Sequence, residues 1–227
     1  MAYGSPAVPG DVRPYLEDVR GGRPVSDEAV EELAERYRRI GGRSPLDDVT
    51  EAQRAALERE LGVPVFVGMK HWHPRIAEAV ESALAGGATR IVGLVLAPHY
   101  SRLSIGEYRE QLLETSRLVA ERAGLERWSF AFQSASATGE PWLGPDVLEE
   151  LDRLHEAGVE KVLVAPIGFV SDHLEILWDL DIEARERAAE LGLELERIES
   201  LNDDPAFVRA LAELVEERLA VSGKSRS

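Results

Sequence analysis

The sequence predicts an α/β fold built from parallel sheets with helices on both faces. Two observations support this prediction. Short apolar segments alternate with helical segments along the chain, and these apolar segments are continuous rather than alternating with polar residues. A strand covered on both faces is apolar throughout, and strands that alternate with helices form parallel sheets. The chain has 227 residues, of which 44% are hydrophobic and 30% charged, as in ordinary globular proteins.

Charge and cysteine content exclude several classes of function. The chain has 26 basic and 42 acidic residues, so its net charge is −16. Nucleic-acid binding requires a basic face, so we expect no nucleic-acid partner. The absence of cysteine excludes disulfides, thiolate nucleophiles and cysteine-ligated iron–sulfur clusters. No apolar run reaches the roughly 18 residues of a membrane span, and no signal peptide is recognisable, so we expect a cytoplasmic protein without a transmembrane segment.

The first third of the chain is predicted to be helical. A short helix is expected over Val12–Arg20, and Ser26 is expected to cap a second helix. A third helix is expected to begin at Thr50, with Gln53 in the capping-box position, and to end at Gly62.

Strands and helices alternate in the rest of the chain. Apolar runs rich in β-branched residues predict five strands: Val63–Met69, Arg90–Ala97, Trp128–Gln133, Lys161–Ala165 and Leu193–Ile198. Start and stop signals predict helices at about Pro74–Ala85, Ile105–Gly124, Asp146–Gly158, Ser171–Leu191 and Pro205–Val221. Ligands of such sheets bind beyond the carboxyl ends of the strands.

The most informative segment follows the fourth predicted strand. It contains Asp172, Glu175 and Asp179, spaced so that they would share one face of a helix. A row of carboxylates at the mouth of a sheet can bind a hard cation or relay protons. Asp172 could equally be a helix-start residue that complements the helix dipole.

The five histidines give a weaker signal. His71 and His73 are two residues apart after a strand, which would suit a metal ion, but two ligands alone are rarely a metal site. We expect a structural role for His99 and a solvated position for His155, while His173 lies within the acidic segment.

Basic residues gather in the N-terminal third in spite of the negative overall charge. Arg20–Pro24, Arg36–Tyr37 and Gly41–Pro45 lie in loops or at helix ends. Arginine binds carboxylates in a bidentate manner, so a polycarboxylate ligand is one interpretation. Ordinary helix C-capping explains the arginines of the second helix equally well.

Together these segments resemble ferrochelatase, the enzyme that inserts ferrous iron into a porphyrin. The chain is most similar to the coproporphyrin III ferrochelatases of Gram-positive bacteria, including actinobacteria. The resemblance implies two similar α/β halves with the macrocycle between them. It is carried by Met1–Pro6, Arg20–Pro24, Arg36–Pro45, Leu94–Tyr108, Phe132–Asp146, Pro166–Asp181 and Leu201–Phe207.

The resemblance also assigns roles to single residues. Glu175 matches the metal-site carboxylate, which in the family works with a histidine to receive iron and remove pyrrole protons. Asp172 and Asp179 match the acidic row that leads away from that site. Tyr3 matches the tyrosine that approaches the iron from the opposite face of the ring. Further matches to porphyrin-binding positions are Arg20, Arg36, Tyr37, Ser44 and Tyr108.

The chain departs from the family pattern in two places. The family has a strand ahead of the segment that matches Met1–Pro6. Between Tyr108 and Glu110 it carries a strand, a helix and a second strand, which ends in a His-Ser-x-Pro motif with the metal-site histidine. This chain has no His-Ser pair. We therefore expect both halves to be incomplete, with an N-terminal half over 1–109, a C-terminal half over 110–222 and a disordered tail over 223–227.

Three functional hypotheses follow from the resemblance. The chain is a monomeric ferrochelatase that inserts ferrous iron, its substrate, into coproporphyrin III or a related porphyrin at a reduced rate. Alternatively, it is a non-catalytic porphyrin- or heme-binding protein, or an incomplete gene product. When two catalytic groups act as a unit, removing one of them usually costs an enzyme most of its rate. The missing histidine, the family partner of Glu175, therefore predicts impaired activity.

Overall fold

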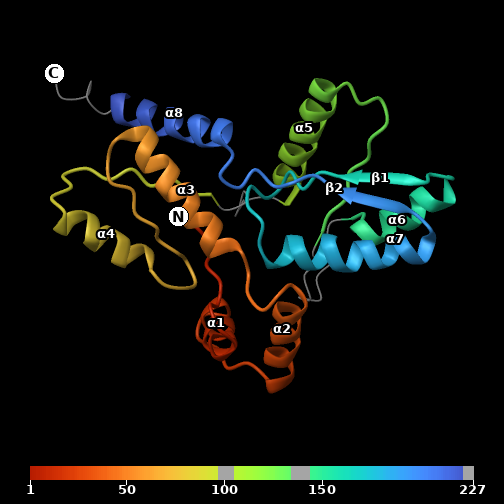
Figure 1. Cartoon of the computed structure of the whole chain (residues 1–227), viewed down its shortest axis with the longest axis horizontal. Coiled ribbons are helices and arrows are strands. Elements are labelled where there is room, and N and C mark those ends of the chain that lie inside the picture. Colours follow the sequence, from red (N-terminus) through yellow and green to blue (C-terminus); the bar gives the residue numbers. More distant parts are fainter. Residues whose placement is uncertain (97–104, 134–143, 222–227) are drawn as a thin grey trace. The chain divides into compact units, whose positions relative to one another are not determined.

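The computed structural model describes residues 1–96, 105–133 and 144–221, and it has the predicted α/β fold with a parallel sheet (Figure 1). The chain forms two compact units. The first comprises Met1–Ala97, Val170–Leu174 and Leu201–Ser227, and the second comprises Pro98–Phe169 and Glu175–Ser200. The predicted tail lies outside the described residues.

The helices follow the sequence prediction closely. In the first unit they are the 3-10 turn Pro9–Asp11, α1 (Val12–Val19), α2 (Asp27–Arg39), α3 (Leu46–Leu61), α4 (Ile76–Ala85) and α8 (Pro205–Val221). In the second unit they are α5 (Ile105–Ala123), α6 (Val147–Glu156), the π-helical segment η2 (Ile176–Ala184) and α7 (Arg185–Leu191). None of the helices in the described ranges is both long and apolar enough to cross a membrane.

Local capping explains why these helices begin and end where they do. The Ser26 hydroxyl accepts a hydrogen bond from the Ala29 N–H at 3.2 Å, and the Asp146 carboxylate accepts one from the Leu148 N–H at 2.9 Å. Asp204 accepts from the Ala206 N–H at 2.7 Å, and Gly62 ends α3 in the left-handed conformation at φ 63°. These bonds satisfy backbone groups that the helix ends would otherwise expose.

Helices α3 and α8 form the core of the first unit. The two helices lie side by side (Figure 1). Leu57 of α3 packs against Val208, Leu211 and Ala212 of α8. Side chains from 65–96 complete the cluster, which buries the apolar faces of both helices away from water.

The predicted role of Gln53 is wrong. Helix α3 begins at Leu46 rather than Thr50, because the Ser44 hydroxyl accepts a hydrogen bond from the Leu46 N–H at 3.2 Å. Gln53 therefore lies inside the helix and is only 2% exposed. Its amide donates to the Ser171 hydroxyl at 3.0 Å and to the Asn202 carbonyl at 2.7 Å. Ser171 bonds to Gln53, and the helix expected from Ser171 begins later along the chain, with η2 at Ile176.

Replacing Gln53 by alanine should lower the free energy of unfolding by about 2–3 kcal/mol, because one buried and one partly buried acceptor lose their donor. Chemical denaturation measures the loss. Gln111→Ala is the matched control, since Gln111 is exposed on α5. Equal stability of the two variants would contradict the structural role of Gln53.

The first two predicted strands are not formed. Val63–Met69 and the described part of the second segment, residues 90–96, are extended, but neither is part of a strand ladder. A strand is stabilised by its hydrogen-bonded neighbours. Among the described residues, the first residues of the N-terminus provide a few such bonds. The Ala2 N–H donates to the Gly68 carbonyl at 3.1 Å, and the Leu96 N–H donates to the Met1 carbonyl at 3.1 Å.

The two extended segments carry apolar side chains that remain exposed. Val63 and Phe66 are 44% and 43% exposed, and Ile91 and Val95 are 46% and 60% exposed. A continuous apolar run predicts a strand that is buried on both faces of a sheet. These two segments have no strand ladder, and their apolar side chains are accordingly exposed.

The second unit contains the parallel sheet. Strands β1 (Lys161–Val164) and β2 (Glu194–Arg197) pair in register from Lys161 opposite Glu194 to Val164 opposite Arg197 (Figure 1). The core around it comprises Leu151, Ala184, Ala188 and Leu193, with Leu148, Val162, Leu191 and Leu195 packed against them. The strand predicted over Trp128–Gln133 is not formed within the described residues, where an isolated bridge joins Phe132 to Asp146.

Candidate functional site

Tyr3 lies beside a basic turn in the first unit. Its side chain is 41% exposed, and the His71 ring packs against it with ring centroids 4.5 Å apart. The Lys70 ammonium is 5.8 Å from the centre of the Tyr3 ring, which allows a cation–π contact. Backbone hydrogen bonds hold this arrangement, because the His71 N–H donates to the Tyr3 carbonyl at 2.9 Å.

Gly4 makes this close approach possible. Its φ is +94°, and a Cβ atom there would lie 2.9 Å from both the Cβ and the backbone nitrogen of Trp72. Any other residue would combine backbone strain with overlap. The residue after Tyr3 is therefore restricted to glycine by both conformation and space.

A carboxylate clamp orients His71. The Asp18 carboxylate accepts from His71 Nδ1 at 2.9 Å and from the Arg75 guanidinium at 2.9 and 3.1 Å. The hydrogen bond from Arg75 holds the pKa of Asp18 below its usual value, and that from His71 acts in the same direction. The clamp is therefore intact at neutral pH, and it is lost as the pH falls through this lowered pKa.

The two neighbouring histidines do not form a metal site. His71 is bound to Asp18, whereas the exposed His73 contacts Glu78 at 3.0 Å. Among the residues that the structure describes, no group of three or more His, Asp and Glu side chains could hold a metal ion.

The predicted porphyrin-binding residues of the first unit differ in exposure. Arg20 is exposed at the end of α1, and Arg36 is half-buried and donates to Glu32 at 2.9 Å. Tyr37 and Ser44 are only 5% and 3% exposed. The side chain of Tyr108 lies outside the described residues. The arginines are thus accessible to an anionic ligand, whereas Tyr37 and Ser44 are buried.

The acidic segment does not form one continuous α-helical face. Asp172 precedes the helix, where its N–H donates to the Asn202 side-chain oxygen at 2.9 Å and its carboxylate accepts from the Asn202 amide at 3.1 Å. Glu175 is exposed and immediately precedes η2. The helical spacing assumed from the sequence therefore does not apply to Asp172.

A π-helical segment changes the surroundings of Asp179. Residues of η2 follow the i→i+5 pattern, which is rare and often found at functional sites. Asp179 is 7% exposed, and the Gln133 amide approaches its carboxylate at 3.5 Å. Nearby along the same segment, Asp181 accepts from Arg197 at 2.8 and 2.9 Å, which neutralises its charge.

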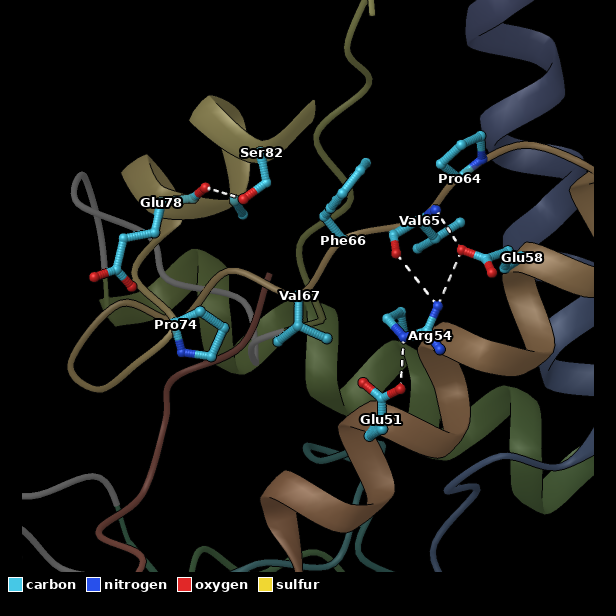
Figure 2. A pocket seen from close by; sticks show the side chains of 11 residues that line it. Glu51, Arg54, Glu58, Pro64, Val65, Phe66, Val67, Pro74, Glu78 and Ser82 are labelled. Atoms are coloured by element: carbon cyan, nitrogen blue, oxygen red, sulfur yellow. Dashed lines mark hydrogen bonds and ion pairs between the residues drawn. The ribbon is translucent and has the colours of Figure 1, made fainter. Parts of the chain in front are cut away.

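A separate cavity of about 420 Å³ lies between α3, α4 and the extended segment 64–67 (Figure 2). Arg54 donates within it to Glu51 at 2.7 Å and to Glu58 at 3.0 Å, as the dashed lines show. None of the residues predicted to bind porphyrin or iron lines this cavity.

Comparison with known proteins decides the family. The Ferrochelatase family model matches residues 1–113 and 106–219. The chain belongs to the ferrochelatase family. It is 37% identical to the ferrochelatase of Herpetosiphon aurantiacus (95% of this chain, 96% of the relative) and 36% to that of Deinococcus radiodurans (97% and 95%). It is 34% identical to the coproporphyrin III ferrochelatase of Geobacillus thermodenitrificans (98% and 96%).

This ferrochelatase-family chain is shorter than the relatives that it matches. The three alignments extend over 293, 299 and 302 positions, whereas the chain has 227 residues. The relatives therefore contain residues that have no counterpart here. The two matched stretches of the chain overlap over residues 106–113.

Sequence reasoning missed the clamp around His71. Asp18 and Arg75 are 57 positions apart in the sequence, and no local pattern connects an acid on one helix with an arginine at the start of another. The available signal was the polar run Lys70–His71 directly after an apolar segment.

Proposed function

We propose that this ferrochelatase binds coproporphyrin III and inserts ferrous iron into it at a reduced rate. The observation that best supports the substrate is the exposed Arg20 and half-buried Arg36 in a chain of net charge −16. Carboxylates on the macrocycle give each guanidinium a bidentate partner. The Geobacillus relatives carry the name coproporphyrin III ferrochelatase, which favours the same substrate.

Glu175 is proposed to receive the iron and the first pyrrole proton. A free porphyrin loses two N–H protons as the metal enters, so a base near the ring is required. The exposed carboxylate of Glu175 next to the start of η2 can offset part of the charge of ferrous iron. Asp172 and Asp179 are proposed to form the acidic row that leads away from Glu175, and Tyr3 is proposed to contact the porphyrin.

The reduced rate follows from the missing imidazole. Neutral imidazole is a better proton carrier than carboxylate at pH 7, and the chain has no His-Ser pair to supply it. We place the junction of the two halves at residues 109–110. The overlap of the family matches over 106–113 supports a missing segment there.

Arg20→Ala and Arg36→Ala should each weaken the binding of coproporphyrin III roughly tenfold, because each variant removes a charge-assisted hydrogen bond to a carboxylate. A titration that follows the Soret band measures the affinity. Arg209→Ala is the matched control, since Arg209 is exposed on α8. An unchanged Soret band with folded wild-type protein would refute the substrate. Binding without iron insertion would instead favour a non-catalytic porphyrin-binding protein.

A further inference from the structure

His71 is much more buried than the neighbouring His73. Only 13% of its side chain is exposed, against 62% for His73. The turn that carries it is closed by hydrogen bonds from the Met69 N–H to the Pro74 carbonyl at 2.7 Å and from the Ile76 N–H to the Met69 carbonyl at 3.2 Å. His71 is therefore fixed in position before any ligand arrives.

The clamp also fixes the tautomer of His71. Both carboxylate oxygens of Asp18 accept hydrogen bonds from Arg75, and one of them also faces His71 Nδ1. An ionised carboxylate can only accept, so the hydrogen of a neutral His71 ring must sit on Nδ1. The lone pair is then on Nε2, as for histidines that a carboxylate orients in other sites.

Arg75 keeps Asp18 in this role. Its guanidinium also donates to the Lys70 carbonyl at 3.0 Å, and its own N–H donates to Glu78 at 2.5 Å where α4 begins. The guanidinium is thus attached to the same turn as His71, and it stabilises the ionised form of Asp18. The clamp connects α1 with this turn through side chains alone.

We propose that Asp18 is a positioning residue that presents His71 Nε2, beside Tyr3, as a hydrogen-bond acceptor for the pyrrole N–H groups of a free-base tetrapyrrole. This inference rests on the proposed function, because it places the macrocycle against Tyr3. In a flat ring both N–H bonds point to the centre. A distorted ring turns one of them out of the plane, where a fixed acceptor can bind it.

A hydrogen-bond acceptor at His71 Nε2 gives the site a preference for the metal-free porphyrin. A metalated porphyrin has lost both N–H groups, so Nε2 has nothing to accept from it. His71 should therefore favour the unmetalated substrate over the metal complex, which also eases release of the product. The preference depends on the tautomer, because an Nε2–H group would donate rather than accept.

Two measurements test the proposal. Nitrogen-15 NMR of histidine-labelled protein, with His71→Ala to assign the signals, should show His71 protonated at Nδ1 and bare at Nε2. Asp18→Ala should abolish this signature. Soret titrations then compare free-base coproporphyrin III with its copper(II) complex, which is square planar and has little affinity for an axial ligand. His71→Ala and Asp18→Ala should each weaken free-base binding roughly fivefold and leave the copper complex unchanged.

His73→Ala is the matched control and should alter neither titration, since His73 is exposed and pairs with Glu78. A wild-type His71 protonated at Nε2 would overturn the inference. The inference would also be overturned if His71→Ala weakened the binding of both porphyrins equally. This second test remains valid even if Asp18→Ala does not fold. Binding of neither porphyrin to the wild type would refute the proposed function itself, and the inference with it.

Discussion

Glu175→Gln should abolish the iron insertion that remains in this chain, with a loss of roughly 100-fold or more. Glutamine keeps the shape of the side chain but can neither accept a pyrrole proton nor neutralise a divalent cation. The effect is expected to be large because the chain lacks the family's imidazole partner, which leaves Glu175 as the proposed base on that side. A continuous assay of ferrous iron insertion into coproporphyrin III measures it.

The control for this variant is Glu156→Gln, which removes an exposed carboxylate from α6 in the same unit. It should leave the rate unchanged. Equal rates for Glu175→Gln and the wild type would contradict the role of Glu175. Iron insertion by the wild type as fast as by an intact ferrochelatase would show that the missing histidine is dispensable.

Gly4→Ala should lower the free energy of unfolding by about 2–4 kcal/mol. Alanine is strained at φ +94°, and its Cβ would lie 2.9 Å from Trp72 and 3.3 Å from the Met69 Cβ. The backbone of the N-terminal segment must shift to relieve this overlap, which moves Tyr3 away from His71. Denaturant unfolding measures the stability, and the Soret titration reports the loss of porphyrin affinity.

Gly62→Ala separates the two causes of that loss. Gly62 also has a positive φ, of 63°, but a Cβ atom added there would meet no neighbouring atom within 4 Å. This variant should cost about 1 kcal/mol from strain alone and leave porphyrin binding intact. If Gly4→Ala lowered the free energy of unfolding no more than Gly62→Ala does, the contact between residue 4 and Trp72 would not be tight.

The helices could be predicted because their signals are local. Ser26, Asp146 and Asp204 each bond to a backbone N–H within three residues, so a short window of sequence contains both partners. Gln53 misled because the same spacing that defines a capping box also occurs inside a helix. Its real partners, Ser171 and Asn202, are more than a hundred residues away.

The strands could be predicted only in part, since a strand requires a partner elsewhere in the chain. Lys161–Val164 and Glu194–Arg197 find each other and pair. Val63–Met69 has the same apolar composition, but its backbone bonds to the N-terminus and to the turn before α4 do not build a strand ladder. Composition shows that a segment suits a sheet, and it does not show that a neighbour is present.

Sequence reasoning named the residues of the candidate site, and their roles stay predictions. Family resemblance named Tyr3 and Glu175 from motifs, and the structure adds what surrounds Tyr3. The clamp of Asp18 and Arg75 on His71 exists only after α1 and α4 have packed, so no motif contains it. The π-helical turns of η2 were likewise invisible, because the α-helical period was assumed throughout.

The exposed apolar segments around Phe66 and Val95 have a consequence for how copies of the protein behave together. Open backbone groups beside apolar side chains are templates for strands of another molecule, so they promote edge-to-edge aggregation. The net charge of −16 opposes this, because like-charged copies repel one another. Salt screens the repulsion but leaves the apolar attraction in place. The colloidal stability of the protein therefore depends on ionic strength, with low salt keeping the copies apart.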